Sequence, residues 1–345
     1  MSDTLPIALD AMGGDHAPAE IVAGALRVAR TGLAVCLVGD QVRIRQELAK
    51  HGDTPSAISV EHTDLVIGAH EHPAKALRAK PGASLPLAVA MVRDGKARAA
   101  LSAGNSGAIM AAGIFSLKRQ PGIERPAFGG IVPTRTGHAF LIDMGANTEC
   151  KPSYLLQFAQ MGSVYMHLAQ GVARPRVGLV SNGEEEGKGT VLTLAAYDLL
   201  KASTLNFVGN IEGNDIMAGK VDVVVCDGFT GNVILKTMEG TAGAIIDLLR
   251  AQLRNSLRAK LGAALALPAL RALGKRLDYA ETGGVPVMGV GGVLINCHGR
   301  SKARAIEQGL RLADRMATQG LVEAIGRELA ANLSTTAEPA PAVAD

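Results

Sequence analysis

Short apolar runs that alternate with helical patterns along almost the whole chain are the feature that most constrains its fold. The first run, residues 6–10, ends on a carboxylate, and two glycines and a helical pattern over 18–30 follow it. Similar apolar runs lie at 34–38, 58–61, 98–102, 129–133, 139–143, 176–181, 206–208, 221–226 and 293–296. Further helical patterns lie at 41–50, 85–94, 154–170, 190–201 and 301–332. This alternation predicts an α/β fold with a mostly parallel sheet, and residues 134–138 predict one antiparallel hairpin.

The composition agrees with this fold class. Hydrophobic residues make up 48% of the 345 residues, aromatic residues only 3%, and there is no Trp. A core of Ala, Val, Leu and Ile suits parallel strands covered by helices. The net charge of +3 is too balanced to predict nucleic-acid binding for the whole chain. We expect a single catalytic domain over 1–333 and a disordered Pro/Ala-rich tail over 334–345.

The cysteines indicate a reducing compartment. Cys36, Cys150, Cys226 and Cys297 are far apart and form no C-x-x-C pair. A buried, inert thiol is the default interpretation, and a reactive thiol at Cys297, next to His298, is the alternative. Because the sequence shows neither a signal-peptide pattern nor an apolar run long enough to span a bilayer, we expect a cytoplasmic protein.

Residues 234–277 break the alternation, because they form a long helical pattern without a strand. Apolar residues recur there at three- and four-residue steps, which predicts an amphipathic seam in a protruding helical hairpin that packs against a second copy. The members of this seam are Ile246, Leu249, Leu253, Leu257 and Leu261.

The same hairpin carries seven bases and no acid between residues 250 and 276, and we expect its tip to be the apolar segment 261–270. An apolar tip surrounded by cations is typical of shallow insertion into an anionic membrane. The residues we assign to this contact are Arg258, Lys260, Leu261, Leu265, Leu267 and Arg271. Burial of the tip against a partner subunit is the alternative.

Six glycine-containing loops follow predicted strands. They lie at residues 10–16, 102–108, 143–147, 182–189 and 227–232, and at Gly283, Gly284 and Gly289. Because the carboxyl ends of parallel strands share one edge of a sheet, we expect these loops to meet in one crevice. Small side chains, hydroxyls, amides and free backbone N–H groups suit phosphate or a similar anion.

Other chemistries are less well supported by these loops. Three residues separate Gly183 from Gly187 where a Walker A loop has four, so we interpret Lys188 as a point charge rather than a kinase lysine. The adjacent glutamates are expected on solvent or on cations of another loop. Ser106 is not in a nucleophile motif, and His62, His70 and His72 are interpreted as part of a solvated loop. We therefore expect no metal and no covalent intermediate.

Five motifs in order resemble those of the bacterial acyl-ACP:phosphate acyltransferases of phospholipid synthesis (the PlsX family). They are DAMGGDHAP, SAGN-x-GA, D-x-GAN, NGEEE-x-KG and CDGFTGNV-x-LK-x-x-EG, within a resemblance that spans residues 7–332. The resemblance implies a homodimer with a three-layer α/β/α sandwich similar to phosphotransacetylases and isocitrate/isopropylmalate dehydrogenases. It also implies that long-chain acyl-ACP and inorganic phosphate are converted to acyl phosphate and free acyl carrier protein, with no cofactor.

The resemblance further implies which residues act. Lys188 and Asn232 match the positions expected to act on phosphate and the thioester. The residues expected to line the same crevice are Asp10, Gly13, Gly14, His16, Asn105, Ser106, Asn147, Asp227 and Thr230. Ser106 stands where threonine is usual, and Gly187 replaces a larger residue. The implied partners are acyl carrier protein, which would also use the hairpin cations, an anionic membrane surface at the inner face of the cell membrane and the downstream glycerol-3-phosphate acyltransferase.

Three alternatives remain open at this point. A phosphotransacetylase acting on a small CoA thioester would not need a basic protruding hairpin. An NAD(P)-dependent decarboxylating dehydrogenase would need a metal-binding acid cluster and an adenine pocket, and neither is visible in the sequence. A non-catalytic scaffold of lipid synthesis would not need six polar glycine loops.

Overall fold

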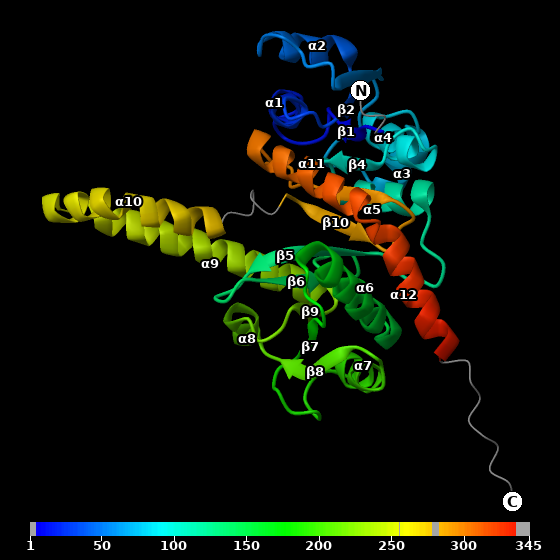
Figure 1. The fold of residues 1–345 in the computed structure, drawn as a ribbon, viewed down its shortest axis with the longest axis vertical. Coiled ribbons are helices and arrows are strands. Elements are labelled where there is room, and N and C mark those ends of the chain that lie inside the picture. Colours follow the sequence, from blue (N-terminus) through cyan, green and yellow to red (C-terminus); the bar gives the residue numbers. More distant parts are fainter. Residues whose placement is uncertain (1–4, 255, 278–282, 336–345) are drawn as a thin grey trace, which may run out of the picture.

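One large sheet runs through the molecule (Figure 1). The computed structural model describes residues 5–254, 256–277 and 283–335. In this part of the chain, eleven strands form a sheet in the order β3-β2-β1-β4-β11-β10-β5-β6-β9-β7-β8. Most neighbouring pairs are parallel, so the α/β prediction with a mostly parallel sheet is confirmed.

The sheet has two groups of parallel strands. The first group comprises β1 (Ile7–Asp10), β2 (Val35–Gly39), β3 (Ile58–His62), β4 (Ala99–Ser102) and β11 (Val293–Asn296). The second group comprises β6 (His138–Ile142), β7 (Arg176–Val180), β8 (Asn206–Ile211) and β9 (Val223–Val225). Between the groups lie β10 (Val285–Met288) and β5 (Ala127–Pro133), and β10 is antiparallel to both β11 and β5.

The predicted hairpin at residues 134–138 is present, because β5 pairs with β6 in antiparallel register. This pairing makes the second group run opposite to the first, so the two groups end at opposite edges of the sheet. The expectation that all six loops share one edge is therefore wrong. Gly289 is a clear example: it follows Met288 at the end of β10, whereas Val285, at the other end of β10, pairs with Asn296.

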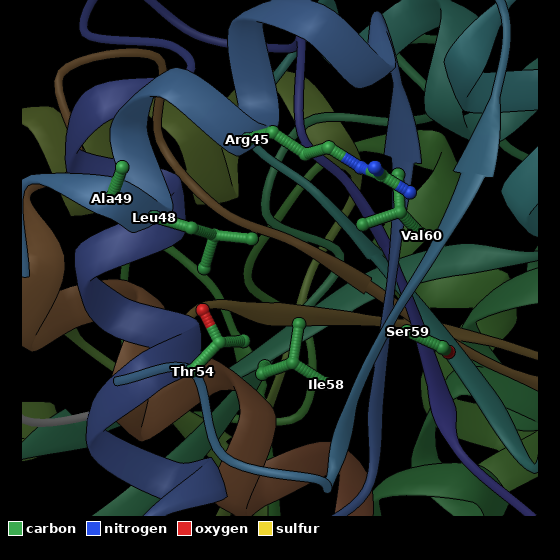
Figure 2. Close-up of a pocket in the computed structure, with 7 residues that line it drawn as sticks. All are labelled: Arg45, Leu48, Ala49, Thr54, Ile58, Ser59 and Val60. Carbon is green, nitrogen blue, oxygen red and sulfur yellow. The ribbon is translucent and has the colours of Figure 1, made fainter. Parts of the chain in front are cut away.

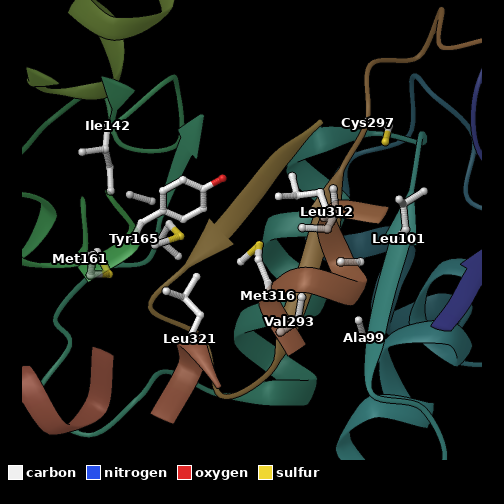
Figure 3. Close-up of a cluster of buried hydrophobic side chains, with 14 of the residues drawn as sticks. Ala99, Leu101, Ile142, Met161, Tyr165, Val293, Cys297, Leu312, Met316 and Leu321 are labelled. Atoms are coloured by element: carbon white, nitrogen blue, oxygen red, sulfur yellow. The ribbon is translucent and has the colours of Figure 1, made fainter. Parts of the chain in front are cut away.

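Helices cover both faces and complete a three-layer sandwich. One face of the sheet is covered by α1 (Ala19–Ala29), α2 (Gln41–Ala49), α6 (Pro152–Gln170), α7 (Val191–Lys201), α11 (Ala303–Thr318) and α12 (Leu321–Thr335), whose buried side chains share a core with those of β1, β4, β11, β6 and β9. On the other face lie α3 (Pro73–Ala79), α4 (Ser84–Arg93), α5 (Ser106–Ala112), its π-helical continuation η1 (Gly113–Leu117), and α8 (Gly213–Ala218). Figure 3 shows part of the first core, where Tyr165 and Met161 lie near Ile142.

The single helix expected over 301–332 is two helices. A break at Gln319 and Gly320 separates α11 from α12, and Gly320 adopts φ 63°, a left-handed conformation that favours glycine. Ser334 and Thr335, which were expected to begin the disordered tail over 334–345, belong to α12 instead. Residues 336–345 lie outside the described residues.

The predicted hairpin is present and protrudes from the sandwich (Figure 1). It consists of α9 (Gly228–Arg254) and α10 (Leu257–Leu277). The segment 261–270 is not its tip, because α9 ends at Arg254 and α10 begins at Leu257, so this segment lies inside α10 together with Pro268. The apolar segment instead runs along α10, where Leu261, Leu265 and Leu267 are 67%, 79% and 40% exposed.

The basic residues predicted to contact a membrane or the carrier protein also lie in α10. Arg258 and Lys260 are exposed near the start of α10, and the side chain of Arg271 lies outside the described part. Within the described residues, no helix combines the length and the hydropathy that a membrane-spanning segment needs.

Candidate active site

The loops that follow the first group of strands, here called the first group of loops, are organised around a buried carboxylate. Asp10, at the end of β1, is only 2% exposed. The Ser102 hydroxyl donates to Asp10 Oδ2 at 2.6 Å, and the Met12 N–H donates to Asp10 Oδ1 at 3.2 Å. Burial raises the pKa of Asp10, while these hydrogen bonds oppose that shift. Asp10 therefore holds the loops in place and does not line the crevice as the sequence suggested.

Gly13 lets the loops after β1 and β4 approach each other. A Cβ atom at Gly13 would lie only 2.9 Å from the Gly104 backbone nitrogen. That nitrogen already donates to Ser102 Oγ at 3.0 Å. Gly14 adopts φ 107°, which side chains rarely tolerate. The two loops are thus interlocked, with Asp15 and His16 exposed beyond them.

The side chain of Asn105 is likewise engaged in hydrogen bonds within the protein. Its Oδ1 accepts the Ala108 N–H at 3.1 Å, which caps α5, and its Nδ2 donates to the Ala69 carbonyl at 2.8 Å. Ser106 is exposed, and its hydroxyl lies 3.0 Å from Asn296 Nδ2. The sheet edge therefore presents a Ser106–Asn296 pair, and Asn105 supports it.

The loops that follow the second group of strands, here called the second group of loops, are also organised around a buried carboxylate, which lies just after β6. Asp143 is fully buried, and its carboxylate accepts N–H groups from Phe128, Gly145 and Ala146 at 3.0–3.1 Å. Asn147 donates both its backbone N–H, at 2.7 Å, and its side-chain Nδ2, at 2.9 Å. Burial raises the pKa of Asp143. Asn147 is therefore fixed inside this loop rather than left open to a ligand.

Asp227 and Thr230 cap the start of α9. Asp227 accepts the Thr230 N–H at 2.9 Å and the Thr230 hydroxyl at 2.7 Å. The backbone at Gly231 passes so close to the Asp143 carbonyl that a side chain there would collide with it. This packing fixes the direction in which α9 leaves the sheet.

Helix α9 links the two groups of loops. Asn232 is exposed, and its Cβ would lie 3.4 Å from a Cβ at Gly145, in the second group. Lys236 lies one turn further on the same side of the helix. The charge of Lys236 acts on His298, which follows β11 in the first group. Helix α9 thus starts beside the second group, where Asn232 lies next to Gly145, and carries Lys236 toward His298 of the first group.

His298 was not among the predicted site residues. Its Nδ1 accepts the Arg300 N–H at 3.1 Å, an arrangement that leaves the ring proton of a neutral imidazole on Nε2. Partial burial, and then Lys236, are the main causes that lower the pKa of His298. A neutral hydrogen-bond donor therefore stands at the edge that also carries Ser106 and Asn296.

Lys188 is exposed in the loop after β7. The glutamates before it bind cations: Glu184 pairs with Lys220 at 2.6 Å, and Glu186 pairs with Lys201 at 2.8 Å. The expectation that these glutamates meet cations of another loop is confirmed for Glu184, because Lys220 lies in the loop between α8 and β9, whereas Lys201 is the last residue of helix α7. Among the described contacts, none joins Lys188 to Asn232, so the role of Lys188 stays a prediction.

Sequence reasoning missed the residues that hold the loops. Ser102, Asp143 and Asn296 are polar residues at the ends of apolar strands, and Ser102 and Asp143 each begin one of the recognised motifs. Their position at strand ends was the available signal. Which of them would be buried depends on the packing of distant loops.

The described residues contain no group of three or more His, Cys, Asp or Glu arranged to hold a metal. Cys297 is 1% exposed, and burial raises the pKa of its thiol to about 12. The alternative of a reactive Cys297 is therefore not supported. A hollow of about 490 Å³ lies between α2 and β3, with Arg45 and Val60 among its lining residues, but no predicted site residue lines it (Figure 2).

Comparisons with solved structures define the class of fold. A phosphotransacetylase from Streptococcus pyogenes superimposes with a TM-score of 0.60 at 16% identity, covering 94% of this chain and 95% of that one. The EutD phosphotransacetylase from Staphylococcus aureus gives a TM-score of 0.57 at 14% identity, covering 91% and 94%. The chain therefore has the phosphotransacetylase fold.

Sequence comparison defines the family. The chain belongs to the family described as fatty acid synthesis protein, whose model matches residues 5–324. Two relatives named phosphate acyltransferase are similar over most of their length. The one from Heliobacterium modesticaldum is 50% identical, covering 92% of this chain and 96% of the relative. The one from Pelotomaculum thermopropionicum is 49% identical, covering 93% and 94%. The prediction of an acyltransferase family is confirmed.

Proposed function

We propose that the chain is a phosphate acyltransferase that moves a long-chain acyl group from acyl carrier protein to inorganic phosphate. The products are acyl phosphate and free carrier protein, and the acyl phosphate feeds glycerol-phosphate acylation in phospholipid synthesis. The observation that carries the proposal is the interlocked pair of polar loops held by Asp10 and Ser102, beside Ser106 and Asn296. Exposed N–H groups, amides and hydroxyls in this arrangement suit an oxyanion.

The proposed reaction is direct attack. A phosphate oxygen adds to the thioester carbonyl, the C–S bond breaks, and the pantetheine thiolate leaves. Lys188 and backbone N–H groups hold phosphate, and Asn232 holds the substrate or the developing oxyanion. An unperturbed thiol has a pKa of about 8.5, so the thiolate leaves largely unassisted. The absence of a nucleophile motif around Ser106 and the burial of Cys226 and Cys297 favour this route over an acyl-enzyme.

The hairpin has three proposed roles. The seam around Ile246 and Leu253, both half-buried in one chain, would continue into a homodimer contact. The exposed Leu265 and Leu267, together with the cations of α10, would contact an anionic surface at the inner face of the membrane. Positive charge there would also attract acyl carrier protein and bring the enzyme near the downstream glycerol-3-phosphate acyltransferase.

A second candidate is acyl transfer between CoA and phosphate, which the likeness to phosphotransacetylases favours. An assay that offers acyl carrier protein and CoA thioesters of the same chain length separates the two. The proposal predicts phosphate-dependent release of free carrier protein, with much slower release of CoA. Equal or faster release of CoA would favour the second candidate.

A further inference from the structure

A groove of about 580 Å³ is lined by residues of α3, α4, α5 and η1. These helices lie on the opposite side of the molecule from the hairpin (Figure 1). Its lining is mainly apolar, with two arginines. The lining residues are Leu77, Arg78, Pro81, Pro86, Ala90, Arg93, Ala112, Phe115 and Ser116. Phe115 is 55% exposed, whereas Phe128, Phe140 and Phe158 are buried in the core. The groove therefore presents an aromatic ring to the solvent.

The segment that builds this surface has an unusual charge. Residues 73–120 contain eight Lys or Arg and one acid, Asp94. Of the 35 bases and 32 acids in the chain, this leaves 27 bases and 31 acids elsewhere. Residues 73–120 are therefore strongly basic, as is the hairpin segment 250–276, although the net charge of the whole chain is small.

Several bases of this segment are exposed, and Arg78 and Arg93 line the groove itself. Lys75, Arg78, Lys96, Lys118 and Arg119 are exposed. Arg93 pairs with Asp94 at 2.7 Å, so the charge of the single acid is already balanced. Arg78 forms no ion pair with any described residue and borders the apolar lining. A partner for this surface needs acidic side chains beside an apolar one.

Two of the helices that line the groove begin near the candidate active site. Phe115 lies in η1, which continues α5, and α5 begins at Ser106. Helix α3 also starts at this edge, where Pro73 approaches Gly107 so closely that a Cβ there would lie 2.8 Å from Pro73 Cγ. The rise of a helix places Phe115 about 13 Å from Ser106. A flexible prosthetic arm can cross such a distance.

We propose that this groove docks an acidic helix of the carrier protein that delivers the acyl group. An apolar side chain of that helix would pack on Phe115, and its acids would face Arg78 and Arg93. The inference rests on the proposed function, because it presumes a protein-bound acyl donor. A concave surface with an apolar lining suits a protein helix better than a lipid surface, which favours a protruding element such as α10.

The test uses the full-length enzyme and unacylated acyl carrier protein. Arg78→Glu and Phe115→Ala are each expected to weaken binding of the carrier protein at least tenfold, measured by calorimetry. In steady-state assays with acyl carrier protein, KM should rise by a similar factor while kcat stays within twofold. Arg43→Glu, at an exposed position on α2 on the other face, is the matched control and should bind normally.

Three outcomes would overturn the inference. Normal carrier binding by both variants would remove the groove from docking. A change in oligomeric state would show that the groove faces a second copy of the chain, and lost vesicle binding would show that it faces a membrane. If the wild-type enzyme itself neither binds the carrier protein nor uses it as acyl donor, both the proposed function and the proposal that the groove docks the carrier protein are wrong.

Discussion

The hydroxyl of Ser102 donates a 2.6 Å hydrogen bond to the buried carboxylate of Asp10, across 92 residues of sequence. Because Ser102 Oγ also accepts the Gly104 N–H, this one serine joins the loops after β1 and β4. The edge that carries Ser106 therefore depends on a hydrogen bond inside the protein.

Ser102→Ala should lower the free energy of unfolding by about 1–3 kcal/mol, because it removes a donor from a buried carboxylate. The pKa of Asp10 is already raised by burial, and losing Ser102 should raise it further. A raised pKa in the folded state makes ionisation costly, so stability falls as pH rises through that pKa. The penalty should therefore be larger at pH 8 than at pH 4. Urea denaturation at both pH values tests this, with the exposed Ser56→Ala as control. An equal penalty at the two pH values would contradict the account.

Lys188→Ala should reduce turnover by about 10²–10³-fold, the usual cost of losing one donor to a developing anion. The fold should be unaffected, because Lys188 is exposed. Lys50→Ala, at an exposed lysine that follows α2, should retain full activity. Near wild-type turnover of Lys188→Ala would remove Lys188 from the mechanism.

The thiols should be unreactive at neutral pH. Burial raises the pKa of Cys150 to about 11 and that of Cys297 to about 12, so both stay protonated at pH 7.5. Iodoacetamide at pH 7.5 should leave activity intact, and Cys150 should be alkylated only as the pH approaches its pKa. Rapid inactivation at pH 7.5, prevented by acyl carrier protein, would instead indicate a cysteine in the reaction.

The pair of substitutions Leu265→Glu and Leu267→Glu should abolish binding to anionic vesicles and leave a folded, active dimer. Both leucines are exposed on α10, so charge there opposes insertion without disturbing the core. Val191→Glu, at a residue that is 87% exposed on α7, should bind vesicles normally. Vesicle flotation and light scattering measure the two properties. Surviving vesicle binding would exclude these leucines as the anchor, and dissociation would identify them as part of the subunit interface.

The local pattern predicted most strands, and β11 matches its predicted range, Val293–Asn296. The strand β10 was missed, because Pro286 lies within it and glycines precede it, features that disfavour a strand. The reversal of direction between the two strand groups depends on how β10 pairs with β11 and β5. No local pattern encodes such a long-range pairing.

The motifs located the loops of the site but not the direction of their side chains. Asn105 was predicted to face the ligand, yet its Nδ2 bonds the Ala69 carbonyl, 36 residues away in sequence. Asp10 and Asn147 likewise hold loops in place instead of facing a ligand, and this depends on the burial of Asp10 and Asp143, which the sequence pattern does not reveal. Lys236 and His298 approach each other only because α9 leaves the sheet in the direction set by Asp227 and Gly231.

The most direct test of acyl transfer to phosphate is a single-turnover experiment with radiolabelled long-chain acyl carrier protein and excess enzyme. Without phosphate, the account predicts that the label stays on the carrier protein. On addition of phosphate, the label should move to acyl phosphate as free carrier protein appears. Label on the enzyme before phosphate is added, or release of carrier protein without phosphate, would contradict direct attack by phosphate on the thioester.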